Sequence, residues 1–203
     1  IDWVYVELWH SLDDVGPAHI DTCLLLADGT LVDRDGKQAL AVPAVVPVDG
    51  RDLRFHLVFR HRNHLPIATE PIAFGATSNQ ATNIDISKGD VVYVGSENPN
   101  LATSNALGLH MSQVKLGNGT TVWAMSAGEV NENQTVTVFD PNVIAKEMMA
   151  TGGTMTYELL LYDLNFNGKI EWGDSNSSAV SRLDWEKAYR NRDKFTEVPV
   201  PLE

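Results

Sequence analysis

Residues 163 to 174 carry the pattern that most restricts how this chain can fold. Acidic and amide side chains occupy positions 1, 3 and 5 of the segment, and Gly168 follows at position 6. A glycine-assisted turn brings alternate side chains to one point, and several converging oxygens are what a hard cation needs. The pattern predicts a calcium loop, with a metal-free Asn/Gly-rich turn as the alternative. The predicted ligands are the side chains of Asp163, Asn165, Asn167 and Asp174 and the backbone carbonyl of Lys169.

A weaker copy of the pattern lies 34 residues upstream, between Glu129 and Asp140. A constant offset of this kind indicates duplication. Gln134 stands where the turn favours glycine, and Glu129 is longer than the Asp it replaces. The copy is therefore either a second calcium site or a metal-free relic in which Val136 keeps its packing role. The ligands of the possible second site are Glu129, Asn131, Asn133 and Asp140.

Each loop is followed by a segment with a helical pattern. After the first loop, Asp140 is predicted as the N-cap and Pro141 as the first helical residue, with Val143, Ile144 and Met148 on one face. The second segment covers residues 176–192. Asp at position 12 is typical of dockerin loops. Residues 127–203 are thus expected to form a small dockerin-like α-helical module, with two loop-helix units and a C-terminal tail.

The first part of the chain, residues 1–126, has the pattern of an antiparallel β-sandwich. Apolar and polar residues alternate in short runs, and turn sequences such as Gly117-Asn118-Gly119 recur between the runs. The expected strands cover residues 2–9, 21–26, 30–33, 39–46, 53–61, 68–74, 82–87, 90–95, 111–116 and 120–126. The fold class is therefore mainly β.

The net charge and the cysteine content of the chain argue against some partners and some covalent links. The formal net charge of −12 argues against a nucleic-acid partner. Cys23 is the single cysteine, so no internal disulfide can form, and its apolar neighbours predict a buried thiol. No apolar run approaches the ~20 residues of a membrane-spanning helix. Because the chain begins with Ile1, we expect a mature fragment or a piece of a longer protein.

Four segments together resemble the C-terminal modules of large surface and secreted proteins of the Bacteroidetes, described as haemagglutinin-like or as type IX secretion substrates. The resemblance covers nearly the whole chain and implies an exported β-sandwich with a calcium-binding, dockerin-like end that attaches to larger partners. Small hydroxyl residues that read a cohesin partner in dockerins are absent near positions 10 and 11 of both loops, so cohesin binding is not implied. The matching segments are Asp2-Trp-Val-Tyr-Val-Glu-Leu8, Phe59-Arg-His-Arg-Asn-His-Leu-Pro66, Val122-Trp-Ala-Met-Ser-Ala-Gly-Glu129 and Asn191-Arg-Asp-Lys-Phe-Thr-Glu-Val-Pro199.

Two groups of residues are candidates for ligand binding. His61 and His64 lie in a basic cluster at an expected strand end, where a spacing of three places them on opposite faces. No Cys or carboxylate lies at zinc spacing from these histidines, and the sequence has no nucleophile elbow. We therefore predict a structural or solvated role for this cluster, with ligand or partner binding as the alternative, and no catalytic residues and no enzyme. Trp3, Tyr5 and Trp9 are expected to point outward from one strand, either as a sugar-stacking platform or packed against a neighbouring domain.

The expected function is that of a non-enzymatic calcium-binding module at the bacterial cell surface or in the extracellular space, serving adhesion, assembly or anchoring. Its expected partners are other surface or secreted protein domains. The alternative is a carbohydrate-binding module that targets a larger secreted protein to a glycan.

Overall fold

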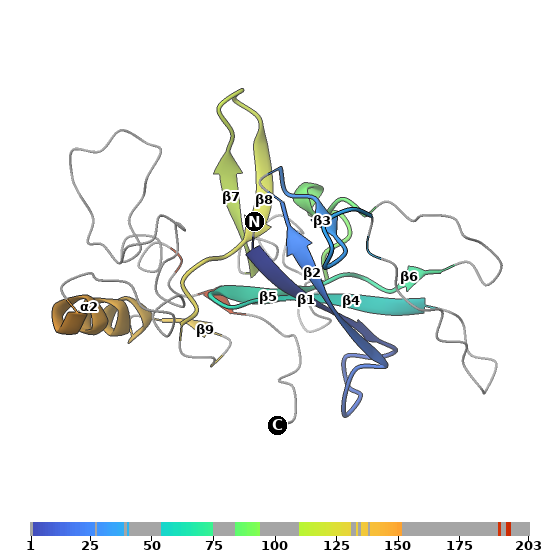
Figure 1. The fold of residues 1–203 in the computed structure, drawn as a ribbon, viewed down its shortest axis with the longest axis horizontal. Coiled ribbons are helices and arrows are strands. Elements are labelled where there is room, and N and C mark those ends of the chain that lie inside the picture. Colours follow the sequence, from blue (N-terminus) through green and yellow to red (C-terminus); the bar gives the residue numbers. More distant parts are fainter. Residues whose placement is uncertain are drawn as a thin grey trace, which may run out of the picture. The chain divides into compact units, whose positions relative to one another are not determined.

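The computed structural model describes residues 2–26, 28–38, 40, 54–74, 84–93, 110–130, 133, 135–137, 139–151, 191 and 194–195. These residues form a mainly β fold, with antiparallel sheets and one α-helix (Figure 1). The chain divides into two compact units. The first contains Ile1–His61, Pro66–Gly95 and Val198–Glu203, and the second contains Arg62–Leu65 and Ser96–Glu197. The expected division at residue 126 stays a prediction.

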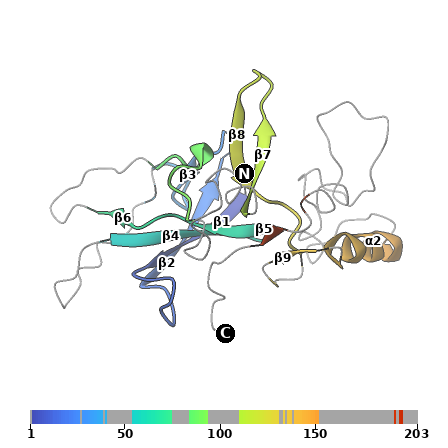
Figure 2. The same ribbon diagram turned by 180° about the vertical axis from the view of Figure 1, so that it is seen from behind.

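The main sheet has six strands, and its central strand is β1. β1 pairs with β2 on one side and with β4 on the other, both antiparallel, and these three strands lie side by side in Figures 1 and 2. The order is β3-β2-β1-β4-β5, and β6 pairs with β4. The strands are β1 Asp2–Trp9, β2 His19–Leu25, β3 Leu31–Val32, β4 Arg54–His61, β5 His64–Ala68 and β6 Ile72–Ala73.

Alternation along β1 assigns its side chains to two faces. Val4, Val6 and Leu8 lie on one face and are fully buried, as their apolar character predicts. The register places Cys23 of β2 beside Val4 and Phe59 of β4 beside Val6, so these two buried residues extend the same apolar layer. Burial of these apolar side chains contributes to the stability of the sheet through the hydrophobic effect.

The other face of β1 is covered at only one end. Trp9 packs with Val58 and Ala68 in a buried cluster, against which Leu12 and Tyr93 are also packed. Trp3 and Tyr5, toward the beginning of the same strand, are about half exposed. Among the described residues, one face of the sheet thus has a buried apolar centre bordered by polar residues such as Asp21 and His19, and the other face is closed around Trp9 and exposes Trp3 and Tyr5.

The second unit contains a hairpin, a short strand pair and the helix. Gly119, with a φ of 88°, forms the hairpin turn, in which its N–H donates to the carbonyl of Leu116. This turn and both flanking strands match the sequence prediction. The elements are β7 Met111–Lys115, paired with β8 Thr121–Met125; β9 Thr135–Val136, paired with β10 Lys194–Phe195; and α2 Phe139–Thr151.

Three sequence expectations within residues 54–93 are wrong. One is the strand expected from 90 to 95, where the described residues 90–93 form a turn and a single isolated bridge at Val92. The segment expected as a strand from 82 to 87 contains instead a 3-10 helix, η1 (Ile86–Lys88), because Asp85 caps its first turn and Gly89 ends it with a φ of 77°. The run expected from 68 to 74 is replaced by β5, which starts at His64, and the short β6. Among the described residues, no helix is long and apolar enough to cross a membrane.

Candidate functional site

The loop from Glu129 to Asp140 is the described copy of the predicted calcium pattern. Glu129, at position 1, is buried, and its Oε1 accepts a hydrogen bond of 3.2 Å from the N–H of Asn133 at position 5. The side-chain oxygen of Asn133 in turn accepts from the N–H of Thr135 at 2.9 Å. Val136, at position 8, is fully buried, so its predicted packing role is confirmed. Asn131 lies outside the described residues.

Asp140 closes this loop from end to end. Its carboxylate is fully buried, and Oδ1 accepts a 3.1 Å hydrogen bond from the N–H of Val130, near the beginning of the loop. Oδ2 accepts from both the N–H and the hydroxyl of Thr137, at 2.8 and 3.2 Å. Three donors thus surround one carboxylate, which satisfies most of its acceptor capacity. The first loop is held closed by the chain's own donors.

The same carboxylate also organises the beginning of helix α2. The hydroxyl of Thr137 accepts from the N–H of Phe139 at 3.1 Å while Asp140 accepts from the N–H of Thr137, an arrangement similar to a capping box. The predicted N-cap at Asp140 is therefore wrong: the helix starts at Phe139, and Asp140 and Pro141 are inside its first turn. Asp140 there also interacts favourably with the helix dipole. Ile144 is fully buried on the helix face that the sequence predicts.

The stronger copy of the pattern, residues 163–174, lies outside the described residues. Its predicted ligands, Asp163, Asn165, Asn167, Lys169 and Asp174, are therefore not placed, and calcium binding there stays a prediction. Among the residues that the structure does describe, no three His, Cys, Asp or Glu side chains form a cluster able to hold a metal ion.

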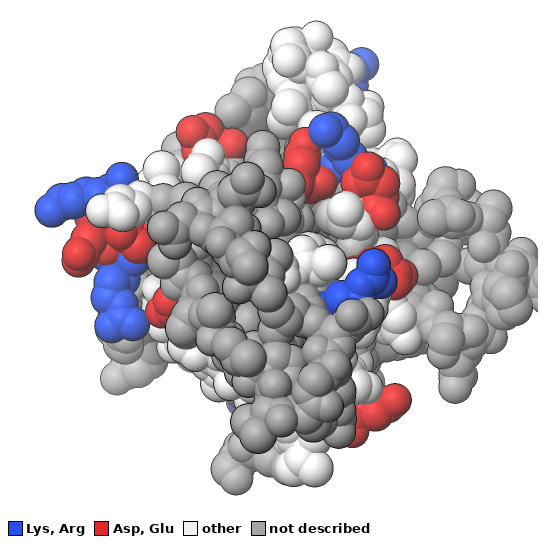
Figure 3. Space-filling model, turned by 90° about the vertical axis from the view of Figure 1, so that its right-hand side faces the viewer, with Lys and Arg blue, Asp and Glu red and all other residues white. Residues whose placement is uncertain are grey.

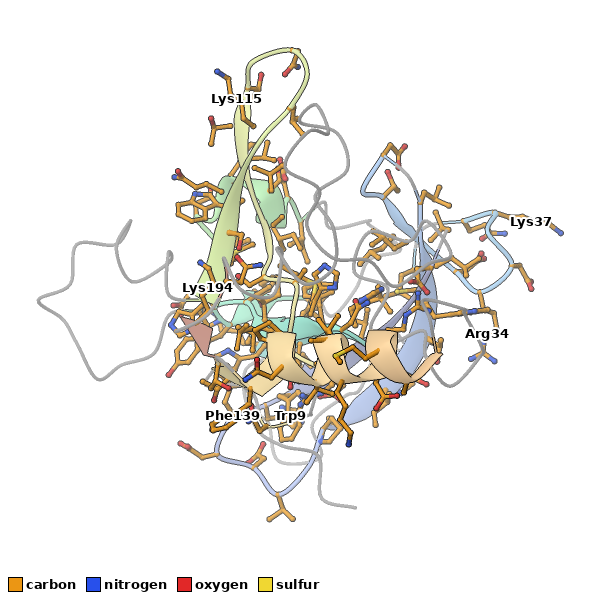
Figure 4. The ribbon with its side chains drawn as sticks, turned by 90° about the vertical axis from the view of Figure 1, so that its left-hand side faces the viewer. Trp9, Arg34, Lys37, Lys115, Phe139 and Lys194 are labelled. Carbon is orange, nitrogen blue, oxygen red and sulfur yellow. The ribbon has the colours of Figure 1, made fainter. Side chains whose placement is uncertain are left out.

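The aromatic stripe of β1 is split between solvent and core. Trp3 is 50% and Tyr5 54% exposed, in agreement with their predicted outward orientation. Trp9 is fully buried, which corrects the expectation that all three rings point outward. Its Nε1 donates to Oε2 of Glu7 at 2.8 Å, and Figure 4 labels Trp9 among the described side chains. A platform formed from this stripe can contain Trp3 and Tyr5 but not Trp9.

A buried ion pair that the sequence analysis does not identify adjoins this stripe. Glu7 is buried on the same face of β1, and its Oε1 accepts from Nε of Arg60 on β4 at 2.7 Å. With Trp9 on its other oxygen, Glu7 has a partner on each side, as a buried carboxylate requires. The sequence does contain the signal, because a Glu in a run of apolar and aromatic residues needs a cation or donors if that face is covered.

The two candidate histidines have different surroundings. His61, at the end of β4, is buried, and its Nε2 lies 3.1 Å from Oδ2 of Asp2 on β1. His64 is half-buried, with Nδ1 2.8 Å from the side-chain oxygen of Asn63. A turn at Arg62 and Asn63 separates them, so the expectation of a single strand end carrying both is wrong. His61 connects two strands of the sheet, which is a structural role.

Polar contacts near residue 191 hold the base of the hairpin within the second unit. The Ser112 hydroxyl donates to Oδ1 of Asn191 at 2.8 Å and lies 2.9 Å from that of Ser126. Nδ2 of Asn191 donates to the Ala127 carbonyl at 2.7 Å. Lys194 donates to the carbonyl of Met111, and burial lowers the pKa of its ammonium below the usual value. Figure 4 labels Lys194, which belongs to β10, and Lys115, which belongs to the hairpin strand β7.

Charges of both signs lie next to each other on the described surface. On the face shown in Figure 3, blue basic and red acidic side chains are interspersed. The exposed pairs Arg34–Asp21, at 3.3 Å, and Lys88–Asp85, at 3.2 Å, illustrate this arrangement.

Comparison of the chain with known protein families, with curated protein sequences and with solved structures finds no match in any of the three.

Proposed function

We propose that this chain is a non-enzymatic calcium-binding module of a larger exported surface protein, in which one calcium ion binds residues 163–174 and rigidifies the end used for anchoring or assembly. The feature that carries the proposal is the pattern of residues 163–174, with acidic and amide side chains at positions 1, 3 and 5, glycine at position 6 and Asp174 at position 12. In the copy that the structure describes, Asp140 at position 12 likewise lies against the beginning of its own loop, with Oδ1 3.1 Å from the N of Val130.

The hydrogen bonds within residues 129–140 support different roles for the two copies of the pattern. Asp140 already accepts three hydrogen bonds from Val130 and Thr137, so calcium would have to compete with these donors. The second copy has the compact Asp163 and the glycine that the first copy lacks. We therefore assign a metal-free structural role to residues 129–140 and the ion to residues 163–174. The resemblance to exported Bacteroidetes modules, and the sandwich and dockerin-like folds that it implies, belong to this same proposal.

Calcium titration of the whole 203-residue chain tests the proposal. Isothermal titration calorimetry should give one calcium per chain, and Asp163→Ala or Asp174→Ala should abolish the binding. Glu129→Gln serves as the matched control in the other loop and should leave the stoichiometry at one. Two results contradict the proposal: no binding heat at millimolar calcium, or loss of binding with Glu129→Gln but not with Asp163→Ala. Magnesium at the same concentration should bind more weakly, because it prefers a smaller, octahedral site.

A further inference from the structure

The open end of the β1 face presents two aromatic rings side by side. Trp3 and Tyr5 are two residues apart on one strand, so they project from the same face about 7 Å apart. They are 50% and 54% exposed, as expected for rings with one side packed on the sheet and the other in water. In the described part of this face, solvent reaches these rings while Trp9, further along the strand, is covered. Trp3 and Tyr5 thus form a shallow aromatic platform.

Fixed polar and apolar groups border the platform. The register places Thr22 of β2 and Arg60 of β4 on either side of Tyr5. Arg60 is held by its 2.7 Å bond to the buried Glu7, so its position is set before any ligand arrives. Ile20, 53% exposed and paired with Glu7, extends the same face. Aromatic surface with a few preorganised polar groups at its edge is the composition of a small-ligand site.

The exposed area favours a small occupant over a protein partner. An aromatic side chain covers about 150–250 Å² when fully buried. Two half-exposed rings together with Ile20 therefore offer on the order of 300 Å², whereas a stable protein interface covers about 800 Å² on each partner. A second copy of this chain, also with a net charge of −12, would in addition be repelled. The same charge disfavours polyanionic ligands.

We infer that Trp3 and Tyr5 form a binding platform for a neutral oligosaccharide. The face of a pyranose ring carries C–H hydrogens, which meet the negative face of an aromatic ring favourably. Its equatorial hydroxyls then reach the edge of the platform, where Thr22 and Arg60 lie. A neutral sugar can stack on the aromatic surface without being repelled by the net negative charge of the chain. A polyanion would be repelled by that charge, and a large apolar partner would need more exposed area than these rings offer. This site is independent of the proposed calcium loop.

A titration panel on the intact chain tests this inference. The probes are neutral hexasaccharides of glucose (β-1,4 and β-1,3), xylose, mannose and N-acetylglucosamine, followed by calorimetry and by tryptophan fluorescence. At least one should bind, and Trp3→Ala and Tyr5→Ala should each weaken it roughly tenfold, a loss that matches one stacking contact. Trp3→Phe should retain part of the affinity, because it keeps an aromatic face. The matched control is Phe139→Ala, which removes an aromatic ring, 67% exposed, from the beginning of helix α2.

Two results of this titration would contradict a sugar platform at Trp3 and Tyr5. The inference is overturned if none of the hexasaccharides binds, or if the variants at Trp3 and Tyr5 bind like the Phe139 control. Sedimentation showing a dimer that Trp3→Ala dissociates would identify the face as a protein interface instead. Circular dichroism of every variant checks that the sheet is intact. Repeating the titration in a chelator separates this site from the calcium loop, since binding here should persist when calcium is removed.

Discussion

The carboxylate of Glu7 lies 2.7 Å from Nε of Arg60, and both side chains are largely withdrawn from water between neighbouring strands. Because the second oxygen of Glu7 accepts from Trp9, one acidic side chain holds a cation and an indole N–H together. Removing one member of such a buried group leaves the others without compensation, which costs more than the pair itself contributes.

Glu7→Ala should therefore destabilise the protein by about 3–5 kcal/mol. The matched control is Arg34→Ala, which breaks a pair whose arginine side chain is 69% exposed and should cost less than about 1 kcal/mol. A double variant, Glu7→Met with Arg60→Met, should recover part of the loss but remain about 1–3 kcal/mol less stable, because Trp9 lacks its acceptor. Urea unfolding followed by circular dichroism measures all three. Equal effects of Glu7→Ala and Arg34→Ala would contradict this assignment.

Asp140 should stabilise the second unit without any metal. Asp140→Ala removes one half of the capping box and the bond to Val130, with an expected cost of about 2 kcal/mol or more. Thr137→Ala removes only the hydroxyl and should cost about 1 kcal/mol. Both losses should be the same in calcium and in a chelator, as judged by thermal unfolding. A loss that vanishes in the chelator would mean that Asp140 acts through a bound ion.

Calcium removal should lower the stability of the second unit selectively. If the ion binds only the folded chain, calcium at one hundred times its dissociation constant adds about 2.7 kcal/mol. Chelation should therefore lower the melting temperature, and Asp163→Ala should lower it to the same value and make it insensitive to calcium. Differential scanning calorimetry measures the shift. An unchanged melting temperature on chelation of the unmodified chain would remove the energetic role of calcium.

Cys23 should make the stability of the chain depend on alkaline pH. Burial raises the pKa of its thiol to about 11, and its Sγ donates to the carbonyl of Val4 at 3.3 Å. Unfolding returns the pKa to its usual value near 9.0, so above pH 9 the unfolded chain loses a proton that the folded chain keeps. Stability from this group is thus complete below pH 9 and falls as pH rises from 9 to 11.

Cys23→Ala provides the reference for this pH effect. The variant should be less stable below pH 9, and its unfolding free energy should fall less steeply than that of the unmodified chain between pH 9 and 11. The folded protein should also react slowly with a thiol reagent at pH 8, and the unfolded protein rapidly. Parallel pH profiles for the two proteins would show that the thiol does not titrate as described.

How far the sequence predicts this fold depends on whether the information is local. The alternation of β1 and the Gly117-Asn118-Gly119 turn are local, and the structure confirms both. The tight turn at Arg62 and Asn63 carries no glycine, so β5 was not expected. The 3-10 helix at Ile86 depends on the cap at Asp85, whose side chain accepts from the N–H of Ser87. The alternation of Ile84 and Ile86 with polar residues favours a strand at the same place, so the sequence pattern alone predicts the wrong element.

The candidate sites show the same limit. Alternation assigns Trp3, Tyr5 and Trp9 to one face, but the burial of Trp9 depends on residues distant in the sequence, among them Val58, Ala68 and Tyr93, that pack in its cluster. The two-residue alternation of β1 predicts that Glu7 points outward. Its burial depends on Arg60, which lies more than fifty residues away in the sequence. In the first loop the spacing predicts correctly that Val136 points inward, whereas the hydrogen bonds of Asp140 depend on the path of the whole loop.

The central position of β1 has a consequence for how the sheet assembles. The β1–β2 pair nearest in sequence is Leu8 with His19, 11 residues apart, whereas the nearest β1–β4 pair is Trp9 with His56, 47 residues apart. Closing a loop about four times longer costs about 1.3 kcal/mol more in chain entropy. The β1–β2 contact therefore has the smaller loop-closure entropy cost. The Glu7–Arg60 pair forms only when the longer loop closes, so ordering the groups that border Trp3 and Tyr5 carries the larger of the two entropy costs.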